Sequence, residues 1–144
     1  MKPLAAALAA LTLLAMPAHA QNRIDQVRPD APALAGPGAW AVGVRTLTLT
    51  DPDRIDVLAS AEAVARGPRS LTVELWYPAA AGTEPGGHYD TVLRDGVTPV
   101  TLHGRAAREA TPATEGPWPL VIISHGYPGN RFLLSHLAET LASH

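Results

Sequence analysis

A continuous apolar run near the C-terminus restricts the possible folds of this 144-residue chain more than any other feature. Leu120 to Ser124 reads Leu-Val-Ile-Ile-Ser, and an unbroken run of this kind is typical of a strand buried on both faces of a parallel sheet. A turn with two glycines follows at 126–130, and residues 131–143 then have the periodicity of an amphipathic helix. The sequence therefore predicts a buried strand, a tight turn and a helix in immediate succession.

The predicted helix over 131–143 has one apolar and one polar face. The expected buried face consists of Leu134, Leu137, Ala138 and Leu141. The expected solvated face includes Ser135, His136, Glu139 and Thr140. Asn130 is placed to cap the helix by accepting a hydrogen bond from an N–H group of the first turn. Strand, turn and helix together form half of a βαβ unit, which needs a second parallel strand after the helix.

The first twenty residues have the pattern of an export signal rather than of a folded segment. Lys2 supplies a positive charge, an apolar run extends from Leu4 to Met16, and Ala18-His-Ala20 is typical of a cleavage site. The apolar run is shorter than the roughly 20 residues that a membrane-spanning helix needs. We therefore predict a signal peptide over 1–20, cleaved after Ala20, and a periplasmic or secreted protein without an integral membrane span.

The mature chain is expected to form an irregular leader over 21–38, which contains three prolines, and one domain over 39–144. Two strands are predicted, over 39–50 and 70–77, because β-branched and apolar residues alternate with polar ones. A turn at Gly67-Pro68 lets these strands pair antiparallel.

The connection over 79–119 is long and rich in glycine, proline and threonine. A short edge strand is expected over 97–102, and Pro99 argues against a central position in a sheet. A connection of this length inside a compact domain usually has a function or covers a surface.

Composition excludes several classes of partner and chemistry. The 11 basic and 13 acidic residues give a net charge of −2, which offers no reason to expect nucleic acid or an anionic membrane as a partner. The absence of cysteine excludes disulfides, thiolate metal sites and a cysteine nucleophile. His136 and Glu139 lie three residues apart on the predicted helix, but no second pair completes a metal site. We expect no metal and no cofactor.

The turn after the apolar run is the candidate functional site. It follows the C-terminal end of a predicted strand, where ligands bind in open α/β sheets, and it precedes a helix N-terminus, which favours negative charge. Gly126 and Gly129 allow the backbone to approach a ligand closely, which suits an oxyanion or a bound anion. The turn matches neither the phosphate-binding loop, since no lysine follows, nor the full dinucleotide fingerprint.

Ser124 and His125 do not have the arrangement of a nucleophile and its base. Successive side chains on a strand point to opposite faces, and Ser124 lacks the G-x-S-x-G pattern of a hydrolase nucleophile. No serine of this chain has that pattern. We interpret Ser124 as a strand-end residue with local hydrogen bonds, and His125 as a residue that binds backbone and holds the shape of the turn.

Two segments resemble the α/β-hydrolase family. Arg69 to Pro78 reads Arg-Ser-Leu-Thr-Val-Glu-Leu-Trp-Tyr-Pro, and Trp118 to Arg131 reads Trp-Pro-Leu-Val-Ile-Ile-Ser-His-Gly-Tyr-Pro-Gly-Asn-Arg. The second is followed by Leu137-Ala-Glu-Thr-Leu-Ala-Ser-His144. The chain is most similar to exported bacterial relatives of dienelactone hydrolase and platelet-activating-factor acetylhydrolase. The resemblance implies an α/β fold, of which this chain supplies the N-terminal portion of the sheet: two antiparallel strands, a third strand, the oxyanion loop and the first helix.

The resemblance also implies an activity, hydrolysis of ester bonds by a serine, an acid and a histidine. The backbone N–H of Tyr127 matches one oxyanion-hole donor, with His125, Gly126 and Gly129 supporting the loop. In the family the three catalytic residues would all follow residue 144, so none is assigned here. The chain is expected to be an inactive N-terminal fragment of a secreted esterase, lipase or acetylhydrolase that acts on a small-molecule or lipid ester without a cofactor.

Two other interpretations stay open. The chain is either an exported, non-catalytic, β-rich binding module that uses 79–119 as its contact surface, or a decayed remnant without function. A G-x-S-x-G motif in the reading frame beyond codon 144 would separate the hydrolase from both. The sequence gives no information on the oligomeric state.

Overall fold

The structure, a computed structural model, describes residues 22–27, 29–31, 33, 36–61 and 63–144. The signal peptide expected over 1–20 lies outside these residues, so its cleavage after Ala20 stays a prediction. The described elements are β1 (Asn22–Arg23), β2 (Ala41–Ile55), β3 (Arg66–Ala79), β4 (His88–Val92), β5 (Pro99–His103), β6 (Ala107–Arg108) and α1 (Ser135–Ser143).

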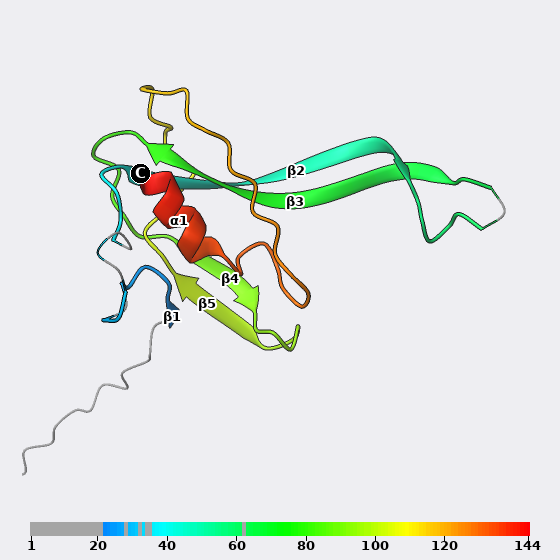
Figure 1. Ribbon diagram of the computed structural model, residues 1–144, viewed down its shortest axis with the longest axis horizontal. Coiled ribbons are helices and arrows are strands. Elements are labelled where there is room, and N and C mark those ends of the chain that lie inside the picture. The colour runs from blue at the N-terminus through cyan, green and yellow to red at the C-terminus, as the bar shows by residue number, and fades with distance from the viewer. Residues whose placement is uncertain (1–21, 28, 32, 34–35, 62) are drawn as a thin grey trace, which may run out of the picture.

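The longest element is an antiparallel ribbon of β2 and β3, which extends away from the rest of the chain (Figure 1). Its register runs from Ala41 opposite Ala79 to Ile55 opposite Arg66, which confirms the expected antiparallel pairing. The strands are longer than predicted. Residues 51–53 form an irregularity in register inside β2, and the turn predicted at Gly67-Pro68 is wrong, because both residues lie inside β3. The short β6 adds to the other edge of β2 in parallel.

The two faces of the ribbon differ sharply in polarity. Residues directly opposite in an antiparallel pair share a face, so Leu47 lies with Val73 and Leu49 with Leu71. The other face carries threonines and serine, with a 2.8 Å hydrogen bond between the hydroxyls of Thr50 and Ser70. Leu49 is more than half exposed, so the apolar face of the outer ribbon is uncovered in the described chain.

A second sheet has the order β1-β5-β4, with β5 antiparallel to β4 and parallel to β1. A strand was expected over 97–102 and lies at Pro99–His103, but it is the middle strand of its sheet rather than an edge. Pro99 is tolerated because it is the first residue of the strand. The turn before it is held by Asp95, whose carboxylate accepts hydrogen bonds from the N–H groups of Val97 and Thr98.

The α/β-hydrolase sheet expected from the resemblance is wrong for this structure. The chain is mostly β, with two small mixed three-stranded sheets and one C-terminal helix. Leu120 to Ser124 forms no strand, and Leu120 and Ile122 are 78% and 84% exposed. Apolar composition alone does not make a strand, since a strand needs a hydrogen-bonded neighbour, and 120–124 pairs with no described segment.

The helix begins later than the sequence predicted. It starts at Ser135 rather than at 131, and Leu134 occupies the N-cap position without a side-chain hydrogen bond. The cap predicted at Asn130 is therefore wrong. Asn130 instead accepts a 2.9 Å hydrogen bond from the N–H of Phe132, which stabilises the turn before the helix.

The buried face of α1 also differs from the predicted one. The buried helix residues are Ser135, Ala138, Glu139 and Ser143. Leu137 and Leu141 are exposed, and so is Leu133 one turn earlier. Of the four residues expected inside, only Ala138 is buried, whereas Ser135 and Glu139 from the expected solvated face are buried.

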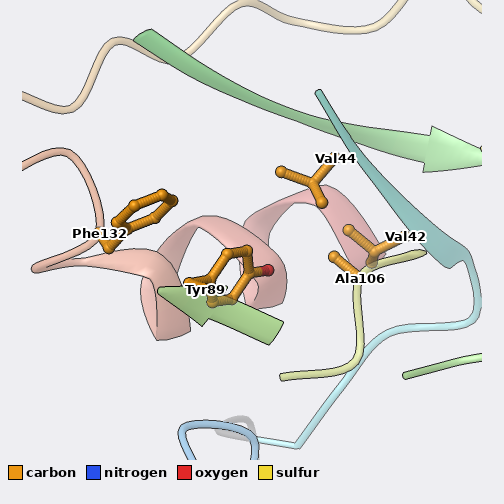
Figure 2. Packing of buried hydrophobic residues seen from close by; sticks show 5 residues of the cluster. All are labelled: Val42, Val44, Tyr89, Ala106 and Phe132. Atoms are coloured by element: carbon orange, nitrogen blue, oxygen red, sulfur yellow. The ribbon is translucent and has the colours of Figure 1, made fainter. Parts of the chain in front are cut away.

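The hydrophobic core lies where the two sheets and the chain leading into α1 meet. It consists of Val42, Val44, Tyr89, Ala106 and Phe132, and Figure 2 shows these five side chains gathered together. Tyr89 and Phe132 are in ring contact, with centroids 5.2 Å apart.

Replacing Val44 with alanine should lower the free energy of unfolding by about 2 kcal/mol, because the change removes buried methyl groups and leaves a cavity. Val57→Ala makes the same change at a residue that is 78% exposed. This control should alter the free energy by less than about 0.5 kcal/mol. Urea unfolding followed by circular dichroism measures both, and equal effects would remove Val44 from the core.

Candidate functional site

The predicted oxyanion loop lies on the surface. Residues 124–127 are all exposed, and the side chain of Tyr127 is fully so. The backbone N–H of Tyr127 has no hydrogen-bond partner in the described chain. The loop therefore offers a free donor to solvent.

Local contacts give the loop its shape. The Nδ1 atom of His125 lies 3.1 Å from the carbonyl oxygen of Gly126, a backbone contact of the kind expected for this histidine. A Cβ atom at Gly129 would lie 2.6 Å from the same carbonyl oxygen, so only glycine fits there without movement. A Cβ atom at Gly126 would meet nothing within 4 Å, which leaves open space beside the Tyr127 N–H.

The loop does not assemble a catalytic group with the residues around it. Ser124 is exposed and makes no side-chain hydrogen bond in the described part of the chain, contrary to the local bonding expected of it. None of residues 124–129 lines either of two cavities of about 350 and 390 Å³ in the described part of the chain. The Tyr127 N–H is thus a hydrogen-bond donor that does not face either cavity.

Sequence reasoning missed the main buried polar cluster, which is centred on Glu139. Its side chain was expected on the solvated face of the helix, yet the residue is only 5% exposed. The carboxylate accepts hydrogen bonds from the N–H groups of Arg105, at 2.9 Å, and Ala106, at 3.3 Å, and from the hydroxyl of Tyr89. A Cβ atom at Gly104 would overlap the Glu139 carboxylate, so any other residue there would force the carboxylate to move.

Tyr89 connects this cluster to the ribbon. Its hydroxyl donates to Glu139 and accepts a 3.0 Å hydrogen bond from the indole N–H of Trp76. Burial, and next the hydrogen bond to the Glu139 carboxylate, raise the pKa of Tyr89 well above its ordinary value. The ring stays neutral at physiological pH, and the geometry suits a structural clamp rather than a proton-transfer group.

A second polar cluster surrounds Glu74 on β3. Its side chain is fully buried and forms ion pairs with Arg131, at 2.9 Å, and with Arg108, at 3.3 Å. These arginines come from the turn before α1 and from β6, so the cluster ties both segments to the ribbon. Arg131 and Glu74 both lie in the segments that resemble hydrolases, but the contact between them is structural.

The described residues contain neither a group of side chains arranged for a metal ion nor a membrane-spanning helix. No group of three or more histidine, aspartate or glutamate side chains among them is arranged to hold a metal ion. His136 is exposed, while Glu139 is buried and hydrogen-bonded, so the two do not form a metal-ligand pair. No helix in this part of the chain is long and apolar enough to cross a membrane.

No protein-family model matches this chain, and searches of curated proteins and of solved structures give no significant match. The resemblance to ester hydrolases therefore rests on the two sequence segments alone. The activity that it implies stays a prediction.

Replacing Glu139 with glutamine should lower the free energy of unfolding by about 2–3 kcal/mol. The amide keeps the volume but places an NH₂ group among three donors, which leaves buried groups unpaired. Glu115→Gln is the matched control at an exposed position, and it should have almost no effect. Thermal and urea unfolding measure both variants, and wild-type stability of E139Q would show that the buried network contributes little.

The raised pKa of Tyr89 predicts a specific loss of stability at alkaline pH. Below pH 10.0, the ordinary tyrosine pKa, both states hold the proton, and the stabilisation is fully present. Above it the unfolded chain loses the proton first, so stability should fall by about 1.4 kcal/mol per pH unit from this residue. Urea unfolding between pH 9 and 11 should show a shallower slope for Tyr89→Phe than for the wild type. Identical slopes in the two proteins would refute the assignment.

Proposed function

We propose that this chain is part of a secreted serine hydrolase that cleaves ester bonds, and that its 125–129 loop supplies one donor of the oxyanion hole. The observation that carries the proposal is the backbone N–H of Tyr127, which is unpaired, exposed and flanked by the open space at Gly126. The Ser-His-Gly-Tyr-Pro-Gly sequence that contains it supports the same role.

The N–H acts on the charge that develops during acyl transfer. A serine oxygen attacks the ester carbonyl, the carbonyl oxygen becomes an oxyanion, and the Tyr127 N–H donates a hydrogen bond to it. Collapse of the tetrahedral intermediate expels the alcohol, and water then releases the acid. Losing one such donor typically lowers the rate by about 10²–10³-fold.

The nucleophile in this proposal comes from sequence other than these 144 residues, because no serine among them lies in a G-x-S-x-G motif. The exposed apolar run from Leu120 to Ile123 supports such an addition. Four consecutive apolar residues are costly to leave in water, and a further segment packed on them would lie next to the loop.

Gly126→Val tests the loop in the protein expressed from the entire reading frame. The branched side chain has room in the folded chain but would occupy the space beside the Tyr127 N–H, so kcat for p-nitrophenyl butyrate should fall about 10²-fold. Gly67→Val is the control, since a Cβ atom there also meets nothing within 4 Å. Tyr127→Phe keeps the N–H and should keep the activity.

Wild-type kcat in G126V would exclude this loop from the oxyanion hole. Labelling with a fluorophosphonate addresses the nucleophile independently. The label is expected on a serine outside these 144 residues, and labelling of a serine within them, or no labelling and no hydrolysis, would reject the proposed arrangement.

The β-rich architecture favours one alternative, an exported binding module without catalysis. The segment expected to provide its contact surface, 79–119, is folded in part as the β4–β5 hairpin and β6. The uncovered apolar face of the ribbon is a more exposed surface. Absence of a G-x-S-x-G motif from the entire reading frame would favour this alternative.

A further inference from the structure

Two adjoining cavities lie away from the proposed oxyanion loop, with volumes of about 350 and 390 Å³. They share Asp25, Pro85 and Arg105 in their walls, so they lie side by side, and we treat the two together as one concavity. Each volume lies in the range of small-molecule sites, which is roughly 300–1,000 Å³.

The two ends of this concavity differ in chemistry. The first is the more apolar one: it is lined by Ile24, Trp40 and Val42, and also by polar residues that include Asp25, Glu139 and Ser143. The second is lined by Arg23, Arg105, His88 and His103, with glycine backbone at 86 and 87. An apolar end next to a basic end fits a ligand with an apolar body and an anionic head.

Arg105 is the free cation of the basic end. Its guanidinium makes no hydrogen bond or ion pair in the described part of the chain, whereas Arg23 is held by Asp25 through a 2.9 Å hydrogen bond. Arg23, Arg105 and Asp25 together give the basic end one net positive charge. The nearby Glu139 carboxylate is turned to the N–H groups of Arg105 and Ala106, so it does not pair with the Arg105 side chain.

The position of Arg105 fits it for recognition. Its backbone is fixed by the hydrogen bond to Glu139, while its exposed side chain lines both cavities. His88 and His103 are opposite each other in the β4–β5 ladder, so both imidazoles belong to one rigid hairpin. A fixed backbone and rigid neighbours reduce the entropy lost when a ligand binds.

We propose that this concavity binds a small amphipathic anion, with its carboxylate or phosphate group at Arg105 and its aliphatic body against Trp40. Charge-assisted hydrogen bonds to the guanidinium supply the selectivity for an anion. Contact with Trp40 and the apolar wall supplies the preference for an alkyl body. The proposal does not depend on ester hydrolysis, because no residue of the 125–129 loop lines either cavity.

Nuclear magnetic resonance titrations of the mature protein test the ligand class. Octanoate and octyl phosphate should cause saturable shifts in the Trp40 indole N–H and in the amides of Gly86 and Gly87. Acetate lacks the alkyl body and octanol lacks the charge, so both should bind at least about tenfold more weakly. Tighter binding of octyl phosphate identifies a phosphate head group, and tighter binding of octanoate identifies a carboxylate.

Two arginine variants test the position of the head group. Arg105→Gln keeps the backbone hydrogen bond to Glu139 and should weaken binding of the preferred anion by about tenfold. Arg94→Gln removes the same charge from the exposed turn between β4 and β5, and its affinity should equal that of the wild type. No saturable binding, equal affinity for octanol, or equal loss in both variants would overturn the proposal.

Discussion

A buried carboxylate determines how the parts of this chain fit together. Taking Glu139 out of water would cost several kcal/mol without compensation, so its position is restricted to places where donors converge. The donors are two consecutive backbone N–H groups, of Arg105 and Ala106, and the hydroxyl of Tyr89 on β4. Tyr89 is bound in turn by Trp76 on β3. One side chain on α1 therefore connects both sheets and allows the helix only one rotation about its axis.

That rotation explains why the apolar residues lie where they do. Directing Glu139 inward turns Leu137 and Leu141 outward, and the preceding Leu133 follows on the same side. Burial of three leucines would contribute several kcal/mol, but the helix cannot bury them and keep the carboxylate paired. Within the described chain, α1 buries the hydrogen-bonded Glu139 carboxylate instead of the leucines, and the three leucines form an exposed stripe.

Local patterns predicted local structure, and long-range pairing decided the rest. The antiparallel ribbon of β2 and β3 was predictable because the alternation of its residues is encoded locally, although the turn predicted at Gly67-Pro68 lies inside β3. The absence of a strand at 120–124 was not predictable from the sequence. Its apolar composition suits a paired strand, but it does not show whether another segment pairs with it. The buried face of α1 was not predictable either. Periodicity places Glu139 on a polar face, but it does not show that three hydrogen-bond donors from distant segments meet there. The exposure of residues 124–127 was not predictable either, because the sequence placed them at the end of a buried strand.

The two proposed sites differ in whether they need a further segment of protein to function. An oxyanion donor has most effect where water is excluded, and the Tyr127 N–H is exposed. The loop lies in sequence between two exposed apolar stretches, Leu120 to Ile123 before it and the leucines at 133, 137 and 141 after it. A segment that covered both would bury apolar surface and desolvate the donor in the same step, so folding and catalytic competence would be coupled. The concavity at Arg105 is already walled by described residues and needs no such addition, so its ligand binding is independent of whatever completes the loop.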